Sequence, residues 1–195
     1  RLGLNRIVLL VIHDLDRSYH GENVAKKLQE LESGMRWLRE MKDSGNIGGF
    51  GAGINDAEMM PLILEHFDLD FFLVAMPYTL LDQGPLEDAF PECEKRGMGI
   101  ILGAPYASGI LAEGSDSLAK YGYAETIESV RSRVRSIERV CRSYGVPLKA
   151  AALQFPLGHS LVASVIPGAL TSGQVGENLE MLRFPVPDGF WSELR

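Results

Sequence analysis

The chain has 195 residues, of which 46% are hydrophobic and 23% are charged, a composition typical of a soluble globular protein. The formal net charge is −7 without a basic patch, which argues against a function in nucleic-acid binding. No apolar stretch approaches the ~20 residues of a membrane-spanning helix, and the N-terminus does not resemble a signal peptide. Cys93 and Cys141 are isolated, which indicates a reducing compartment, so we expect a cytoplasmic protein without membrane partners.

Five short apolar runs predict β-strands, and segments with helical periodicity lie between them. The first run, residues 7–12, ends at His13, and its unbroken apolar character predicts a parallel strand buried on both faces. The predicted strands are residues 7–12, 47–52, 70–75, 98–103 and 162–166. The predicted helices are residues 22–43, 56–66, 85–96, 125–144 and 171–182, the last with Thr171 and Ser172 as cap candidates. Residues 112–124 form one long irregular stretch, of the kind that covers a ligand.

Strands that alternate with helices predict βαβ units, a parallel sheet and one α/β domain over residues 1–195. Two arrangements fit this order. A doubly wound open sheet would bind its ligand at a switch point, although neither G-x-G-x-x-G nor G-x-x-x-x-G-K-[ST] is present. Part of a (β/α)8 TIM barrel would leave the first and last strands each with an unpaired edge. Composition alone does not choose between them.

Several segments resemble the aldo/keto reductase family, in consistent order along essentially the whole chain. Those similar to the family's fourth, fifth, seventh and eighth strands are residues 2–13, 50–55, 98–111 and 164–179. Residues 77–83 and 151–156 are similar to the branch that contains bacterial aldose, fucose and pyridoxal 4-dehydrogenases. The resemblance implies that the chain supplies about strands 4–8 of a (β/α)8 TIM barrel.

The resemblance also implies an activity, that of an NAD(P)-dependent oxidoreductase interconverting the carbonyl of an aldehyde or sugar and an alcohol. The family's catalytic group is a tyrosine acid/base, an aspartate, a lysine and a histidine, and only the histidine has a counterpart, His13. The other three come from strands upstream of Arg1, so we expect a C-terminal portion of a reductase that alone turns over little substrate. A non-catalytic nucleotide-binding module that regulates a partner, or a self-sufficient flavodoxin-like domain, are the alternatives.

His13, at the end of a strand, is well placed to act as a neutral imidazole that donates a hydrogen bond to a carbonyl oxygen as it becomes an alkoxide. The alternative is a histidine in a loop, or one satisfied by backbone groups in the core. Together with Asp14, Asp16 and His20 it also supplies enough ligands for zinc or iron. These residues lack the i, i+4 pairing of a helical site, and short acidic loops are usually solvated. We therefore expect no metal.

The residues after the last two strands are candidates for cofactor binding. Small residues in 103–109 allow close backbone approach to a pyrophosphate, and the alternative is a tight strand-to-loop exit. The candidates there are Pro105, Tyr106, Ala107, Ser108 and Gly109. The start of helix 171–182 favours an anion, and the resemblance assigns adenine contacts to Glu177 and Asn178. The remaining candidates are Ile166, Gly168, Ala169 and Gln174, with Asn55 for the nicotinamide carboxamide.

The resemblance bears on the choice between NAD and NADP. Gly168 and Gln174 stand where many members have a lysine and an arginine for the 2′-phosphate, and Ala169 replaces a serine. A charge-assisted contact is worth about 1.5–3 kcal/mol, so the loss of two predicts that NAD is favoured. The sequence indicates a small-molecule carbonyl or sugar substrate without identifying it, and gives no oligomeric state.

Overall fold

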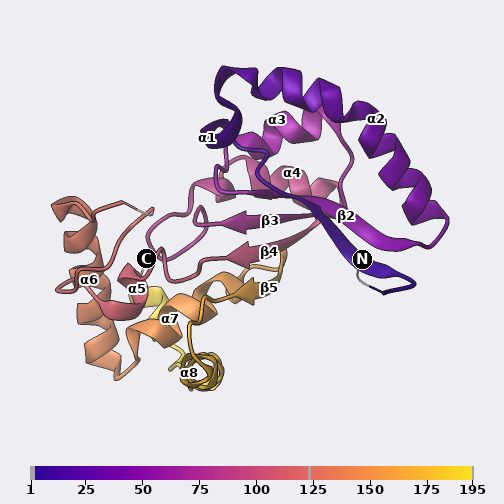
Figure 1. Cartoon of the computed structure of the whole chain (residues 1–195). Helices are drawn as coiled ribbons and strands as arrows, with labels where there is room; N and C mark the ends of the chain where they lie inside the picture. The colour runs from indigo at the N-terminus through magenta and orange to yellow at the C-terminus, as the bar shows by residue number, and fades with distance from the viewer. Residues whose placement is uncertain (1–2, 123, 195) are drawn as a thin grey trace. The chain divides into compact units, whose positions relative to one another are not determined.

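A computed structural model describes residues 3–122 and 124–194 as a parallel β-sheet with helices (Figure 1). The strands are β1 (Ile7–Ile12), β2 (Ile47–Ile54), β3 (Phe71–Ala75), β4 (Gly99–Gly103) and β5 (Val162–Ile166). They hydrogen-bond in the order β1-β2-β3-β4-β5, so the chain order is also the spatial order. All five predicted strands are confirmed to within two residues at either end. No helix in the described ranges is both long and apolar enough to cross a membrane.

The chain divides into two compact units. Unit 1 comprises Arg1–Pro77 and Gly84–Ile101, and unit 2 comprises Tyr78–Gln83 and Leu102–Arg195. Strand β4 contributes residues to both units. The expectation of a single domain over residues 1–195 stays a prediction.

Unit 1 places its helices on one side of its strands (Figure 1). These helices are α1 (Arg17–His20), η1 (Gly21–Asn23), α2 (Val24–Asp43), α3 (Met59–His66), η2 (Gly84–Leu86) and α4 (Ala89–Lys95). Helix α2 buries Leu28, Met35 and Leu38, the apolar residues of one helix face, and confirms the predicted helix over residues 22–43. Strand β2 needs glycine for close strand packing, because a Cβ at Gly51 would overlap the carbonyl oxygen of Phe71.

Strand β1 differs from the expectation of a strand buried on both faces. All six of its residues are apolar, but none is buried, and the exposed fractions of Val8 and Leu9 are 71% and 47%. The reason is its position: β1 ends the strand order and pairs in parallel with β2 along one edge, from Ile7–Ile47 to Ile12–Ala52. An apolar run therefore predicted the strand correctly, but not which parts of the chain cover it.

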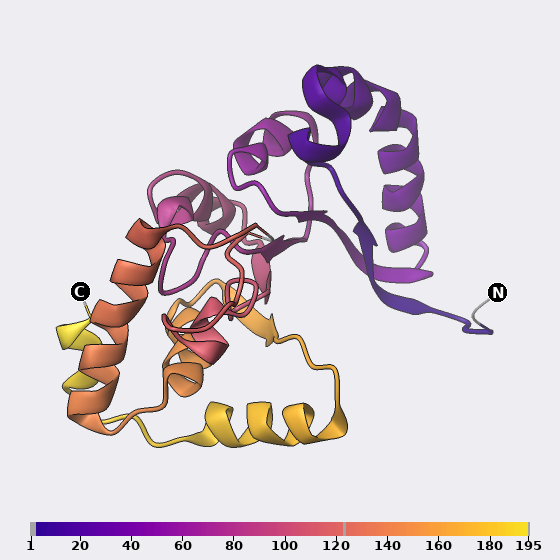
Figure 2. The same cartoon turned by 60° about the vertical axis from the view of Figure 1, so that its left-hand side comes forward.

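Unit 2 is built around a short helix that the sequence analysis did not predict. Its helices are α5 (Ile110–Glu113), α6 (Glu128–Tyr144), α7 (Leu148–Gln154), η3 (Phe155–Gly158), α8 (Ser172–Arg183) and α9 (Phe190–Glu193). Helix α7 contacts α5, α6 and α8, and Figure 2 shows α8 running apart from α6. The small buried side chains of Ala150, Ala151 and Ala152 allow these neighbours to approach α7 closely.

The segment 112–124 is anchored to α6 over the part that the structure describes. The buried Ser115 donates hydrogen bonds to the Glu138 carboxylate from its backbone N–H (3.0 Å) and its hydroxyl (2.8 Å). Arg131 donates to the carbonyl oxygens of Ser115 and Ser117, each at 2.6 Å. The first residues of this stretch belong to α5, so it is less irregular than predicted.

Candidate functional site

His13 is the first residue after β1, at the carboxyl end of the strand, where parallel α/β proteins place functional residues. Its side chain is 73% exposed, and its Nδ1 lies 2.7 Å from Oδ1 of Asp14. That oxygen is shielded from solvent, and no described residue gives it a hydrogen bond of acceptable angle, so the pair is close without being aligned. Asp14 has a left-handed backbone, with φ 61°, and its N–H donates to the carbonyl oxygen of Gly53 at 3.0 Å.

Asp16 is completely buried, contrary to the expectation that this acidic loop is solvated. Its carboxylate accepts hydrogen bonds from the backbone N–H groups of Asn55 (2.9 Å) and Asp56 (3.0 Å), and from the Asn55 side chain (3.3 Å). A buried carboxylate is stable only when its oxygens are satisfied in this way. Asp16 therefore ties the loop after β1 to the loop after β2, and it holds Asn55, the carboxamide candidate.

The four side chains considered as metal ligands do not share one arrangement. Asp16 is satisfied by N–H donors, Asp14 lies against His13, and His20 closes the short helix α1. Within residues 3–122 and 124–194, no three His, Cys, Asp or Glu side chains gather in an arrangement suited to a metal ion.

The loop after β4 has an unusual backbone. Ala104, Ala107 and Ser108 have φ values of 50°, 48° and 59°, and Gly109 has 109°. Non-glycine residues seldom adopt this region, and such positions persist only where the surroundings hold them. Hydrogen bonds from Ala107 N to Ala104 O and from Gly109 N to Tyr106 O, each 2.9 Å, define the loop. The candidates Pro105 to Gly109 thus lie in one tight turn.

Tyr106 connects this loop to α8. Its hydroxyl donates a hydrogen bond of 2.7 Å to Oδ1 of Asn178, and the amide of Asn178 donates to the carbonyl oxygen of Gly168 at 3.4 Å. Burial, with a smaller contribution from Glu177, raises the pKa of Tyr106 to about 12, so its hydroxyl stays a donor at neutral pH. Two candidate segments that are distant in sequence therefore meet.

The N-terminus of α8 is formed as predicted. Thr171 is its N-cap, and Oγ1 accepts from the backbone N–H of Gln174 at 3.2 Å. The side-chain oxygen of Gln174 accepts from Leu170 N at 2.6 Å, and Glu177 pairs with Lys149 of α7 at 2.7 Å. Ile166, Gly168 and Ala169 are exposed. Lys149 was not a candidate from the sequence, although its place in an alanine-rich segment indicated a helical position.

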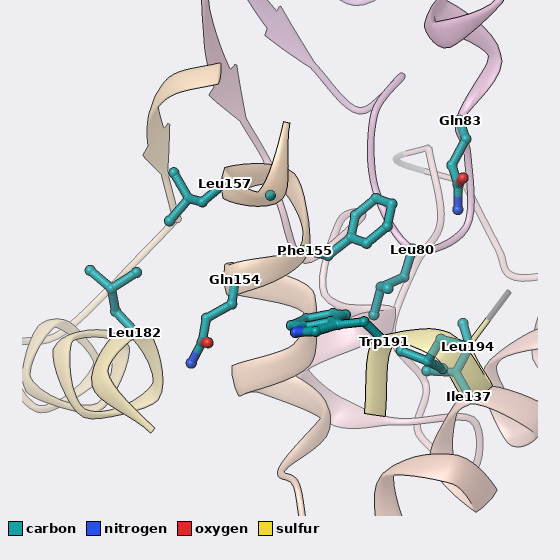
Figure 3. Close-up of a pocket in the computed structure, with 10 residues that line it drawn as sticks. Leu80, Gln83, Ile137, Gln154, Phe155, Leu157, Leu182, Trp191 and Leu194 are labelled. Atoms are coloured by element: carbon teal, nitrogen blue, oxygen red, sulfur yellow. The ribbon is translucent and has the colours of Figure 1, made fainter. Parts of the chain in front are cut away.

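A cavity of about 620 Å³ in unit 2 contains none of these candidates. Most of the side chains labelled in Figure 3 are aliphatic or aromatic, and Trp191 is 6.4 Å from Phe155 between ring centres. The amide side chain that α7 contributes to the cavity, that of Gln154, already donates to the carbonyl oxygens of Met181 and Phe184. A binding site is expected to present convergent polar groups, and this cavity has few.

Comparison with known proteins decides the family. The profile of the Aldo/keto reductase family matches residues 1–195. The chain belongs to the aldo/keto reductase family. It is 37% identical to the pyridoxal 4-dehydrogenase of Microbacterium luteolum and 34% identical to the D-threo-aldose 1-dehydrogenase of a Pseudomonas species, over all of this chain. It is 23% identical to the NADH-specific methylglyoxal reductase of Escherichia coli K12, over 96% of this chain.

The chain spans 57–58% of the length of these curated relatives. Among solved structures, the holo form of an aldo-keto reductase from Bacillus halodurans aligns with a TM-score of 0.70 at 21% identity, over 97% of this chain and 60% of that one. The glycerol dehydrogenase of Gluconobacter oxydans gives 0.68 at 16%, over 99% and 58%. This likeness confirms the fold class: the five β/α units correspond to part of a (β/α)8 TIM barrel.

Proposed function

We propose that this chain serves in an NAD(P)-dependent oxidoreductase that interconverts a small aldehyde or sugar and its alcohol. Family membership supports the proposal, as do the names of the two dehydrogenase relatives. The observation that carries it is the hydrogen bond between Tyr106 and Asn178, because it joins the two segments that the resemblance assigns to the cofactor.

The groups of unit 2 fit a dinucleotide. The first N–H groups of α8 have no partner inside the helix, and the helix dipole favours an anion there. No atom lies within 4 Å of a Cβ built on Gly168, so this position leaves room beside the loop. Glu177 has a second carboxylate oxygen besides the one paired with Lys149, and the Asn178 amide has a second N–H besides the one bonded to Gly168, so both can still contact an adenine ring. Leu170, 95% exposed, supplies an apolar surface for it.

In this proposal the residues of the chain bind and orient, while the bound nicotinamide carries the hydride. His13 contributes a hydrogen bond at the substrate oxygen, where negative charge develops when a carbonyl is reduced. The resemblance assigns the tyrosine, aspartate and lysine to earlier strands. We therefore expect these 195 residues alone to bind cofactor and to turn over little substrate.

NAD is the favoured cofactor. Residues 166–175 contain neither lysine nor arginine, so this segment offers no charged partner for a 2′-phosphate. Gln174, which stands at one of the expected phosphate positions, already uses its side chain on the backbone of Leu170. The name of the Escherichia coli relative, an NADH-specific reductase, agrees with this preference.

Calorimetric titration with NADH tests the proposal. The double variant Glu177→Ala, Asn178→Ala should weaken binding by about tenfold or more, the effect of losing two hydrogen bonds. Glu180→Ala is the matched control, because Glu180 lies exposed on the same helix, and it should leave the affinity unchanged. Circular dichroism checks that α8 remains folded. Absence of NADH binding by the unaltered chain, or equal affinities in all three proteins, would refute the proposal.

A further inference from the structure

The loop after β1 holds a carboxylate against the imidazole of His13. Neighbouring residues of an extended strand point to opposite faces, so His13 and Asp14 would diverge if β1 continued. The left-handed φ of 61° at Asp14 ends the extended geometry, and Oδ1 comes to lie 2.7 Å from Nδ1 of His13. Aspartate is among the few residues that adopt this conformation readily.

Gly53 of β2 lies beside both residues on the neighbouring strand. Its carbonyl oxygen accepts the Asp14 N–H at 3.0 Å. A Cβ built on Gly53 would lie 3.1 Å from Cγ1 of Val11, which is tighter than ordinary contact, and 3.4 Å from Cδ2 of His13, an ordinary contact distance. The backbone of Asp14 is therefore anchored to β2, with the imidazole of His13 next to position 53.

The carboxylate oxygen that faces the ring needs a donor. Asp14 Oδ1 is shielded from solvent and has no aligned hydrogen bond within the described residues, a costly state for a charged oxygen. Nδ1 of His13 lies 2.7 Å from it and can donate to it once the ring turns so that its N–H is aligned. Nδ1 can do so only when it carries a proton.

We propose that Asp14 is a positioning residue that keeps the proton of neutral His13 on Nδ1. This inference rests on the proposed function and refines it. With the proton on Nδ1, the outer nitrogen Nε2 of a neutral ring is an acceptor. It donates to the substrate oxygen only when the ring is an imidazolium, whose charge the Asp14 carboxylate offsets.

The consequence concerns which form of His13 orients the substrate. A neutral imidazole that donates to the carbonyl, as expected from the sequence, requires the proton on Nε2. The pairing with Asp14 instead makes the imidazolium the form that donates to the substrate oxygen, because only then do both ring nitrogens carry a proton.

Long-range ¹H–¹⁵N correlation spectra of the chain test this, since they distinguish a protonated ring nitrogen from a bare one. Spectra are recorded at about pH 9, where histidines are neutral, and His13→Gln assigns the signals. His20, His66 and His159 serve as internal references. The form protonated at Nδ1 should exceed the other by about fivefold or more, between the effects of an exposed and a desolvated charged pair.

Two variants separate the carboxylate from the backbone. Asp14→Gly keeps the positive φ and removes the acceptor, so the excess of the Nδ1-protonated form should be lost. Asp14→Asn replaces the charged acceptor with an amide that can donate to a bare Nδ1, so the excess of the Nδ1-protonated form should fall or reverse. A predominant Nε2-protonated form in the unaltered chain, or the same distribution after Asp14→Gly, would overturn the inference.

The spectrum of the unaltered chain shows which ring nitrogen of His13 carries the proton even if a variant does not fold, and recording it requires no cofactor. Failure of NADH binding would remove the proposed function, whereas failure of the tautomer assignment would leave that function standing and remove only the role of Asp14.

Discussion

Asp16 accepts a hydrogen bond of 2.9 Å from the backbone N–H of Asn55, so the loop after β1 is tied to the loop after β2. Replacement of this buried carboxylate by alanine leaves the N–H groups of Asn55 and Asp56 without their acceptor. We expect Asp16→Ala to lower the free energy of unfolding by about 2–4 kcal/mol, measured by urea denaturation. Asp43→Ala, at an exposed residue of α2, should change it by less than about 0.5 kcal/mol. Equal stability of the two variants would contradict the structural role of Asp16.

Tyr106 should make stability depend on alkaline pH. Its pKa is raised from 10.0 to about 12 in the folded chain, mainly by burial, so ionisation favours the unfolded state. The stabilising contribution is complete below about pH 10 and is lost as pH rises to about 12, a change of roughly 2–3 kcal/mol.

Tyr106→Phe isolates this contribution, because burial also raises the pKa values of Tyr78 and Tyr121. The difference in unfolding free energy between the unaltered chain and the variant should shrink as pH rises above 10. A difference that is constant with pH would show that the hydroxyl of Tyr106 titrates normally.

A lysine at position 168 should shift cofactor preference. Gly168 is exposed, and no atom lies within 4 Å of a Cβ built there, so the side chain can be accommodated. Gly168→Lys should raise the affinity for NADPH relative to NADH by about tenfold, since one charge-assisted contact is worth about 1.5–3 kcal/mol. Gly168→Ala controls for the loss of glycine. Tight NADPH binding by the unaltered chain would contradict the predicted preference for NAD.

The two thiols should be unreactive in the native chain. Cys93 and Cys141 are free and buried, and burial raises the pKa of each to about 11. The thiolate is the reactive form, so at pH 7.5 a disulfide reagent should modify neither residue until denaturant is added. Rapid modification of one thiol in the native chain would identify local opening around α4 or α6.

The fold was predictable where local signals agree. The apolar runs located all five strands, and Thr171 marked the start of α8. Leu148–Gln154 also carried a usable signal, since three consecutive alanines after Pro147 favour a helix. Residues 151–156 were considered only as a segment similar to the family, so α7 was not among the predicted helices.

The residues of the candidate site could be named from the sequence, but the hydrogen bonds between them could not. Tyr106 and Asn178 were both candidates, but the hydrogen bond between them joins residues 72 positions apart and leaves no local pattern. The burial of Asp16 likewise depends on a loop 39 residues later. Asn55 was a candidate for the cofactor, yet its amide is already bonded to Asp16, which no spacing rule indicates.

The left-handed residues of the loop after β4 have a further consequence. At Ala107 and Ser108 a side chain opposes the backbone geometry by about 1–2 kcal/mol per residue, so the loop holds its shape against its own local preference. Its amide groups are consequently oriented before any anion arrives, and little chain entropy remains to be lost on association. Glycine at these two positions would remove the unfavourable backbone energy. The folded chain would then be more stable, but the loop would be more mobile and would bind its ligand more weakly.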